Sequence, residues 1–186
     1  MKLVWLDLET TGLDPLAHQV LEVAVATADL HDPFNLTWVY SAVLPLAPTP
    51  RTALDPFIID MHTKNGLLAD CDSWLTKRRE EVDEALVKVV PWVEDKEERC
   101  TLAGSSIHFD HSFIKVHFPR LNKNLSHRHY DVSALKLYCQ SLGMPKFKKA
   151  EAHRAKDDII ESVAHAKECT EWLKRNLGQT PNVHMH

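Results

Sequence analysis

Residues 3–13 read LVWLDLETTGL, an apolar run that carries two acids and ends in a Thr-Thr-Gly turn. This density of Val, Leu and Trp predicts a β-strand, and alternate side chains of a strand point to the same face. Asp7 and Glu9 therefore share one face, where two carboxylates repel each other unless a cation lies between them. Mg²⁺ or Mn²⁺, which prefer oxygen ligands, would supply that cation. An edge strand with both acids in water explains Asp-x-Glu alone about equally well, but a turn that brings backbone near a substrate favours the metal site.

A second signal stands near the C-terminus, where residues 151–158 read EAHRAKDD. His153 lies just ahead of a predicted long helix, and Asp158 lies in the first turns of that helix. An aspartate near a helix N-terminus is common compensation of the helix dipole, and this explains Asp157. Combined with the Asp-x-Glu strand, the segment makes chemical sense, because Asp158 would hold a metal ion while His153 takes a proton from water.

Three strands are predicted in the early part of the chain, where Val, Leu, Trp and Ala are concentrated. They cover residues 2–8, 19–28 and 36–44. Asp14-Pro15 and Asp32-Pro33 supply breaks between them. Residues 47–51, which contain two prolines, lead away from this β region into a connecting segment.

Apolar residues at helical spacing follow the connecting segment. The first such run is Leu75, Val82, Leu86, Val89 and Val93, with Pro91 interrupting its last turn. The later predicted elements are a short strand near residues 101–104, a helix at 108–117, a short strand at 130–132, a helix through 135–139 and a long amphipathic helix ending near Gly178. This order indicates an α/β fold with a mixed sheet. We expect one domain over residues 1–178 and a flexible tail over residues 179–186.

The formal net charge of −4 argues against a protein that coats long nucleic acids, because such proteins neutralise many phosphates with a basic face. An enzyme that acts on one or two phosphates needs only a local cationic site, so the charge leaves that class open. No apolar run approaches the ~18 residues of a membrane span. Asp7 and Glu9 also interrupt the N-terminal apolar stretch, unlike a signal peptide. We therefore expect a soluble cytoplasmic protein without a membrane partner.

Four cysteines and four of the tryptophans are interpreted as structural. The cysteines include no Cys-x-x-Cys pair, which argues against a disulfide frame or a zinc site in a protein that is not exported. They are Cys71, Cys100, Cys139 and Cys169. The tryptophans whose neighbours suit core packing are Trp38, Trp74, Trp92 and Trp172.

The two acidic motifs, D-x-E-T-T-G-L and H-x-A-x-x-D, together resemble the histidine-type subgroup of the DEDD exonucleases, which have a ribonuclease H-like fold with a mixed sheet flanked by helices. That pattern requires one more aspartate in mid-chain, and Asp110 in the stretch GSSIHFD at residues 104–110 matches it. Within this superfamily the chain is most similar to oligoribonucleases. The supporting stretches include YDVSALK at residues 130–136 and the segment at residues 153–162, in family order. The match is poor at residues 29–51 and 68–99.

The resemblance implies a two-metal phosphodiester hydrolysis that proceeds from the 3′ end and releases 5′-mononucleotides. The implied ligands of two Mg²⁺ or Mn²⁺ ions are Asp7, Glu9, Asp110 and Asp158. Ions roughly 3.5–4 Å apart stabilise both the attacking and the leaving oxygen in such a reaction. His153 would be the general base, and Asp131 is interpreted as structural. The implied substrate is single-stranded RNA of about two to five nucleotides, dinucleotides above all.

Oligoribonucleases also hold the 5′ end of their short substrate, and the resemblance implies a further set of residues for this task. The residues that would surround the terminal phosphate are His62, Ser106, Arg128 and Ser133, whose donors suit a phosphate. Leu13 and Phe57 would press on the bases, although family members commonly carry tryptophan at the position of Phe57. His127 replaces a tyrosine that the family contributes across a homodimer interface, so a homodimer is also implied.

Three other interpretations remain open. A DNA-directed 3′→5′ exonuclease of the proofreading type would share every catalytic residue. A non-catalytic module that binds nucleic-acid ends would be expected to have lost one carboxylate or the histidine. A zinc hydrolase would use His108, His111 and His153, although no third soft ligand stands at a typical spacing beside the first two. Lys146, Lys148 and Lys149 would attract phosphate or belong to a solvated loop.

Overall fold

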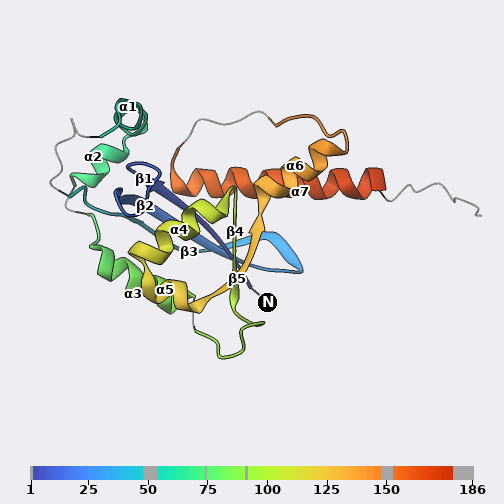
Figure 1. Cartoon of the computed structure of the whole chain (residues 1–186), viewed down its shortest axis with the longest axis horizontal. Helices are drawn as coiled ribbons and strands as arrows, with labels where there is room; N and C mark the ends of the chain where they lie inside the picture. The colour runs from blue at the N-terminus through green and yellow to red at the C-terminus, as the bar shows by residue number, and fades with distance from the viewer. Residues whose placement is uncertain (1, 48–53, 74, 91, 148–152, 178–186) are drawn as a thin grey trace, which may run out of the picture.

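The fold is a single mixed β-sheet with helices on both faces, as the sequence predicts (Figure 1). The computed structural model describes residues 2–47, 54–73, 75–90, 92–147 and 153–177. The strands, in the spatial order β3-β2-β1-β4-β5, are β1 (Lys2–Thr10), β2 (Val20–Asp29), β3 (Asp32–Val43), β4 (Cys100–Gly104) and β5 (Leu125–Asp131). The first three strands are antiparallel, while β4 runs parallel to β1 and β5 runs parallel to β4.

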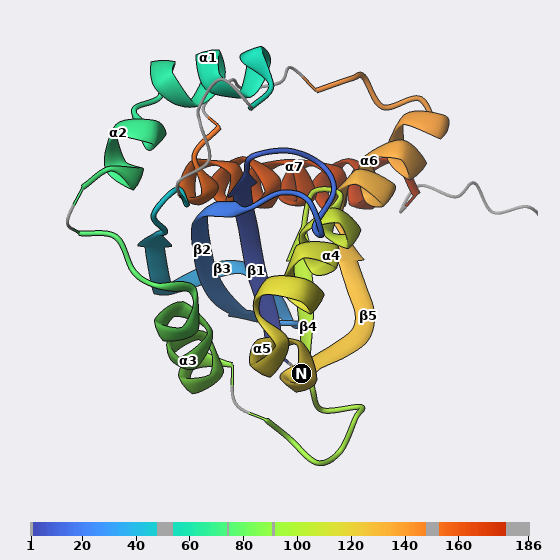
Figure 2. The same ribbon diagram turned by 60° about the vertical axis from the view of Figure 1, so that its left-hand side comes forward.

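Seven helices surround the sheet in the described part of the chain (Figure 2). They are α1 (Pro56–Lys64), α2 (Leu67–Cys71), α3 (Arg79–Val89), α4 (Ile107–His117), α5 (Pro119–Asn124), α6 (Val132–Ser141) and α7 (Ala155–Leu177). The long helix α7 packs across the first four strands together with α6, and α3, α4 and α5 lie on the opposite side. Helices α1 and α2 lie beyond one end of the sheet, near the beginning of α7.

The alternation of side chains along β1 fixes which face receives the acids. Leu3 and Trp5 are fully buried in the cluster that contains Ile159 of α7. Val4 and Leu6 are buried in the other cluster, against α3 and α4. Because the period of a strand is two residues, Asp7 and Glu9 continue the Leu3 and Trp5 face and point toward the beginning of α7.

Several element boundaries differ from those predicted. Strand β3 begins at Asp32, so the break between β2 and β3 lies at residues 30–31 and not at Asp32-Pro33. Helix α3 begins only at Arg79, so Leu75 lies outside it and is exposed. The helix ends at Val89, before Pro91, and Pro91 lies outside the described residues. Strand β5 is longer than expected. The prediction was too short because the polar sequence LSHRHYD shows no clear alternation of apolar and polar residues.

Helices α1, α2 and α5 were not predicted at all. Helix α1 stands in the stretch interpreted as connecting chain, although Asp55 caps it and Pro56 occupies its first turn, both ordinary start signals. Helices α2 and α5 have five and six residues, fewer than two turns, so no apolar period can repeat in them. The predicted tail at residues 179–186 lies outside the described residues.

The structural interpretation of the cysteines is confirmed, since all four are buried and free. Trp172 packs against the small cluster that contains Cys139 and Cys169. The expectation for Trp38 and Trp92 is wrong, because these side chains are 38% and 55% exposed and carry Lys156 and Arg99 over their rings. Trp74 lies outside the described residues. None of the described helices is both long and apolar enough to cross a membrane.

Gly104 ends β4 where the chain turns into α4, and this position tests how tightly β4 and β1 pack. A Cβ atom there would lie 2.9 Å from the backbone oxygen of Leu6. Because backbone atoms of a central strand cannot move aside, we expect Gly104→Ala to lower the free energy of unfolding by about 1–3 kcal/mol, as overpacking does.

The matched control is Gly12→Ala, whose Cβ would meet the ring of His18, a flexible side chain that can turn away. We expect this control to change stability by no more than about 0.5 kcal/mol. Urea unfolding of both variants decides the matter, and equal stability for the two would contradict the close approach of β1 and β4.

Candidate active site

Three of the predicted metal ligands converge at the beginning of α7. Asp7 and Glu9 come from β1, and Asp158 comes from the first turn of α7. One ligand atom from each of the three lies within 4.8 Å of the others, and they form the one group of three such side chains found over the described ranges. The shared face predicted for the first two acids is therefore what brings them to the third.

Asp110 joins this group from the opposite side of β1. It lies in the first turn of α4, is buried, and its Oδ1 accepts a hydrogen bond from the backbone N–H of Leu8 at 3.0 Å. Leu8 separates the two acids of β1, so Asp110 is fixed beside both. The turn that starts α4 places Ser106 in the left-handed region, with a φ of 53°.

Burial and neighbouring carboxylates govern the electrostatics of the site. Burial, with further contributions from the Asp158 and Glu22 carboxylates, raises the pKa of Glu9 to about 9. Burial also raises the pKa of Asp110 to about 7, against the stabilising N–H of Leu8. The pKa of Asp7 is raised by burial and then by the Asp110 charge, and the pKa of Asp158 is raised by burial.

This donor set fits a hard divalent cation. Carboxylate oxygens are the ligands that Mg²⁺ and Mn²⁺ prefer, and a cation among them would stabilise the charged forms that burial and repulsion disfavour. The histidines of the zinc alternative do not converge. His111 hydrogen-bonds to His129 at 2.9 Å, His108 lies 3.7 Å from Asp131, and His153 lies at the acids. The geometry therefore supports an oxygen-ligated metal site.

His153 lines the same cleft as Asp7 and Asp158, a hollow of about 350 Å³. The histidine occupies a backbone conformation with a φ of 46°, which non-glycine residues adopt only rarely. Its backbone oxygen accepts a hydrogen bond from the side chain of Asn65. The next residue, Arg154, forms an ion pair with Glu22 of β2.

Sequence reasoning missed the residues that surround His153. They are Asn65, Glu22, Arg154 and Asp70, and Asp70 also pairs with Arg154. Glu22 lies opposite Glu9 in the β1–β2 pairing. The one local signal is that Arg154 directly follows His153. The partnership with Glu22 depends on the register of two strands, which the sequence does not reveal.

Two of the predicted phosphate-binding residues come together on another wall of the cleft. The Oγ atoms of Ser106 and Ser133 lie 3.0 Å apart, and Lys136 lines the same cleft. Asp131 holds them in place, because its carboxylate caps α6 and accepts hydrogen bonds from the N–H groups of Ser106 and Ser133. The structural interpretation of Asp131 agrees with these contacts.

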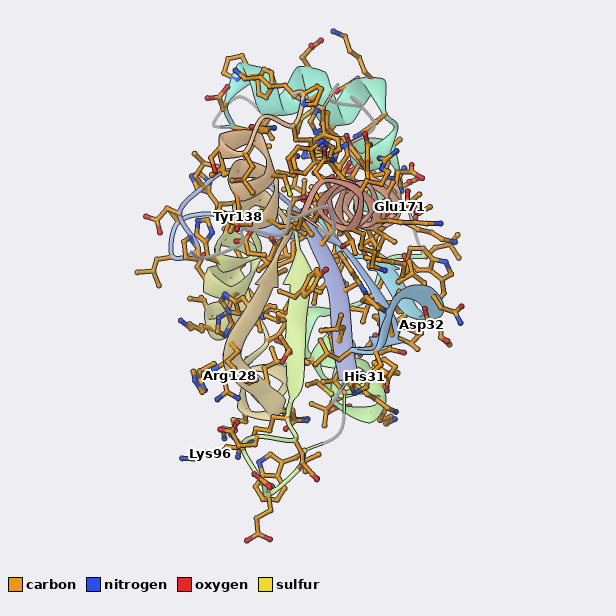
Figure 3. All side chains as sticks on the ribbon, turned by 90° about the vertical axis from the view of Figure 1, so that its right-hand side faces the viewer. His31, Asp32, Lys96, Arg128, Tyr138 and Glu171 are labelled. Carbon is orange, nitrogen blue, oxygen red and sulfur yellow. The ribbon has the colours of Figure 1, made fainter. Side chains whose placement is uncertain are left out.

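His62 and Arg128 do not join this pair within one chain. His62 is fully buried on α1, with its Nε2 3.8 Å from Glu9, and its Nδ1 has no hydrogen-bond partner among the described residues. Arg128 is paired with Glu97 and points outward from β5, toward the side where Lys96 lies (Figure 3). It stands three residues before the strand end at Asp131, about 10 Å away along an extended chain.

The remaining predicted contacts are exposed side chains. Leu13, on the loop after β1, is 79% exposed, and Phe57, on the first turn of α1, is 67% exposed. His127 is exposed on the edge strand β5. Lys146 precedes residues 148–152, which lie outside the described residues and include Lys148 and Lys149.

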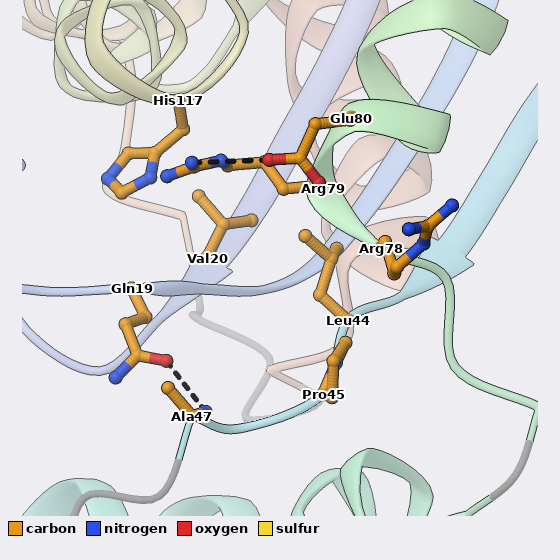
Figure 4. Close-up of a pocket in the computed structure, with 9 residues that line it drawn as sticks. All are labelled: Gln19, Val20, Leu44, Pro45, Ala47, Arg78, Arg79, Glu80 and His117. Atoms are coloured by element: carbon orange, nitrogen blue, oxygen red, sulfur yellow. Dashed lines mark hydrogen bonds and ion pairs between the residues drawn. The ribbon is translucent and has the colours of Figure 1, made fainter.

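A second cavity, of about 500 Å³, lies on the other side of the sheet and contains no predicted site residue (Figure 4). Val20, Leu44 and Pro45 supply its apolar wall, and Arg79 and His117 lie at another side. Nε2 of His117 lies 3.0 Å from the backbone oxygen of Pro15. This contact joins the loop that carries Leu13 to the end of α4.

Comparisons with known proteins agree with this geometry. The model of the family RNase_T, described as exonuclease, matches residues 4–165. The chain is 36% identical over 168 residues to an oligoribonuclease of Corynebacterium diphtheriae, covering 87% of this chain and 78% of that protein. It is 32% identical over 166 residues to an oligoribonuclease of Vibrio cholerae, covering 87% and 90%. A probable oligoribonuclease of Schizosaccharomyces pombe is 32% identical over 169 residues, covering 87% and 64%.

Solved structures of E. coli exonuclease I share the fold. The complex with a dT13 oligonucleotide superposes with a TM-score of 0.68 at 13% identity, covering 95% of this chain and 42% of that one. A zinc-bound complex of the same enzyme with single-stranded DNA gives a TM-score of 0.64 at 14% identity. The chain thus spans about two fifths of the length of these structures. At such identity the likeness shows the fold alone, which is the predicted ribonuclease H-like fold.

The raised pKa of Glu9 links stability to pH. Above its ordinary pKa of 4.5 the unfolded chain releases a proton that the folded, metal-free protein keeps up to about pH 9. The folded state then binds more protons, so its stability falls as pH rises across this window. We expect Glu9→Gln to remove part of this fall, up to about 1 kcal/mol per pH unit. Denaturant unfolding in EDTA at pH 5 and pH 8 measures it.

The control for this experiment is Glu84→Gln, an exposed glutamate that pairs with Arg120 on the surface. This variant should keep the slope of the wild type. Mg²⁺ added at pH 8 should stabilise the wild type, since an ion that binds only the folded state shifts the unfolding equilibrium. A difference between wild type and Glu9→Gln that stays constant from pH 5 to pH 8 would contradict the crowded-acid description.

Proposed function

Since the chain belongs to the RNase_T exonuclease family, we propose that it is a 3′→5′ exoribonuclease that hydrolyses very short single-stranded RNA to 5′-mononucleotides. Family membership makes the chain a 3′→5′ exonuclease of the DEDD type, a hydrolase of phosphodiester bonds that uses divalent metal ions. The preference for RNA, and for short RNA, is the finer part of the proposal. The relatives named oligoribonuclease, which align over 87% of this chain, support that part.

One observation carries the proposal, namely the convergence of carboxylates from β1, α4 and α7 with a histidine at the edge of the same cleft. A non-catalytic module that binds nucleic-acid ends would not need to keep all five of these side chains. The residues that would hold two Mg²⁺ or Mn²⁺ ions are Asp7, Glu9, Asp110 and Asp158. When bound, such ions stabilise the attacking and leaving oxygens of an in-line displacement at phosphorus.

The protein's own groups then have defined tasks. His153 accepts a proton from the attacking water on its imidazole ring. The water oxygen forms a new bond to phosphorus while the bond from phosphorus to the 3′ oxygen of the preceding nucleotide breaks. That 3′ oxygen takes up a proton, and the products are a 5′-mononucleotide and a chain shorter by one nucleotide. Leu13 and Phe57, both exposed, are available to stack on bases.

Recognition of the 5′ end is proposed for the paired hydroxyls of Ser106 and Ser133, with Lys136 on the same wall of the cleft. His62 is buried beside Glu9, so in this proposal it belongs with the acids and not with the paired hydroxyls. Arg128 and His127 stand on the exposed edge strand β5, away from the cleft of their own chain. A homodimer would let β5 of one protomer approach the cleft of its partner, and this is how both residues would contribute.

Substrate length gives the sharpest test of the proposed function. A site matched to two nucleotides uses its phosphate contacts only when the 5′ end reaches them, so longer chains forfeit these contacts. A hydrogen bond to a charged group is worth roughly 1.5–3 kcal/mol, and 1.4 kcal/mol is a factor of about ten. We expect kcat/KM for a 5′-phosphorylated RNA dinucleotide to exceed that for a seven-nucleotide RNA by about tenfold or more. Digestion of 5′-labelled RNAs from two to seven nucleotides long measures this.

Two comparisons make the length experiment specific. Ser133→Ala should reduce the preference for the dinucleotide, whereas Ser141→Ala, which removes an exposed hydroxyl bonded to its own helix turn, should not. DNA strands of the same lengths form the second arm. Equal specificity constants for two- and seven-nucleotide RNAs would refute the length preference, and faster cleavage of long DNA would favour a DNA-directed exonuclease.

His153→Ala tests the role of general base. Such a group contributes about 10²–10⁴-fold to a rate, so we expect kcat to fall by that factor while Mg²⁺ binding stays intact. Steady-state kinetics give the rate, and isothermal calorimetry gives the metal affinity. His31→Ala, at an exposed turn far from the cleft, is the matched control and should change neither (Figure 3). Loss of Mg²⁺ binding in His153→Ala would instead make His153 a metal ligand.

A further inference from the structure

We propose that Asn65 and Arg154 are positioning residues that hold the ring of His153 at the acid cluster. The inference rests on the proposed role of His153 as general base and adds the question of what keeps that base in place. In the described part of the chain, neither side chain hydrogen-bonds to Asp7, Glu9 or Asp158. Asn65 binds the backbone oxygen of His153, and Arg154, the next residue in the chain, is anchored through its guanidinium to Glu22.

The backbone at His153 needs such support because its conformation is unfavourable. A φ of 46° lies in the left-handed region, which is unfavourable for a residue other than glycine. A strained residue of this kind persists only where its surroundings determine it. If the restraint were removed, the residue would relax toward an ordinary conformation and its ring would swing away from the acids.

Asn65 supplies the first restraint. Its side-chain amide donates a hydrogen bond to the backbone oxygen of His153, 88 residues further along the chain. The other half of the same amide is also engaged, since Oδ1 accepts from the N–H of Leu67 at 3.0 Å. The N–H of Asn65 ends α1 by bonding to the backbone oxygen of Met61. Asn65 is thus fixed between α1 and α2, and it transmits that fixed position to His153.

Arg154 supplies the second restraint, on the other side of His153. Its Nε and Nη2 donate to the two oxygens of Glu22 at 3.1 and 3.0 Å, a fork-like pair. Nη2 also contacts Asp70 at 2.9 Å, and Nη1 donates to the backbone oxygen of Asn65 at 3.3 Å. The guanidinium therefore joins β2, α2 and the end of α1 at one point.

Glu22 is the buried partner of Arg154 in this arrangement. Its side chain is 6% exposed and also accepts the N–H of Ala155, the first residue of α7, at 3.0 Å. Glu22 is paired with Glu9 across the β1–β2 ladder, where it would otherwise be a further uncompensated acid beside the cluster. Because Arg154 neutralises it, Glu22 serves as an anchor for the segment after His153. His153 lies between the contact made by Asn65 and those made by Glu22, so its backbone is held from both sides.

A double-mutant cycle tests this inference. We expect Asn65→Ala to lower kcat on a short RNA by about tenfold or more, since a displacement of about 1 Å of a reacting group can cost up to 10²-fold. KM and the Mg²⁺ affinity should stay within about twofold of the wild type. In the His153→Ala background, Asn65→Ala should cause no further loss, because residues that act through one another are not additive.

Asn176→Ala is the matched control, because it also removes an asparagine amide bonded to a backbone oxygen, that of Trp172, but far along α7. It should lower kcat in neither background. Arg154→Lys keeps the charge beside Glu22 and loses the fork, so it should reproduce the loss of Asn65→Ala, again only when His153 is present. Rates are normalised to the folded fraction measured by circular dichroism, which separates positioning from loss of fold.

Histidine ring NMR signals give a readout that does not depend on activity. The signals of His153 are identified by their absence from His153→Ala, and we expect them to shift in Asn65→Ala but not in Asn176→Ala. A full additional rate loss from Asn65→Ala in the His153→Ala background, or unmoved ring signals, would overturn the inference. An unchanged rate in His153→Ala alone would instead refute the proposed function, while the ring signals would still report on the position of His153.

Discussion

Repulsion among four carboxylates that share one small volume is the constraint on which the architecture of this site depends. Burial raises the pKa of all four, and the charges of neighbouring members raise those of Asp7, Glu9 and Asp110 further, so the folded chain carries a cost that a cation would relieve. The fold bears this cost because each acid comes from a well-packed element. Asp7 and Glu9 end an otherwise apolar strand, while Asp110 and Asp158 stand in first helical turns, where the helix dipole favours negative charge.

The same constraint explains where the charge of Arg154 is directed. Arg154 lies beside the acids in the chain, yet its guanidinium is directed to Glu22 and Asp70. An arginine placed among the metal ligands would compensate their charge and compete with a bound ion. Paired with Glu22, it removes a surplus acid from the group and stiffens the segment around His153. The acids at this end of the sheet therefore have two different roles. The four proposed ligands remain free to bind metal, whereas Glu22 is neutralised by Arg154 and holds the surrounding backbone in place.

The sequence predicts most of the site wherever the chemistry lies in a local period. Alternation along residues 3–9 predicts that Asp7 and Glu9 share a face, and helical spacing places Asp158 at the beginning of α7. Prediction from the sequence fails where a contact depends on the register of two strands or on a short helix. The pairing of Glu22 with Arg154 requires the alignment of β2 with β1, and Asn65 ends a helix of nine residues. The position of Arg128 on β5, several residues before Ser133, was hidden for a related reason, because the polar sequence of that strand shows no clear period.

A physical reason for a length preference follows from where the parts of the proposed substrate site are mounted. Ser106 and Ser133 are held by Asp131 at the ends of β4 and β5, and the acids are held by β1 and the helices packed on it. Both groups thus stand on one hydrogen-bonded sheet, so the distance between them is set by the scaffold and not by a mobile loop. Leu13 and Phe57, in contrast, are exposed apolar side chains that can stack on any base, since every base has a π face. A site built in this way would measure the length of its substrate strictly while remaining tolerant of its sequence.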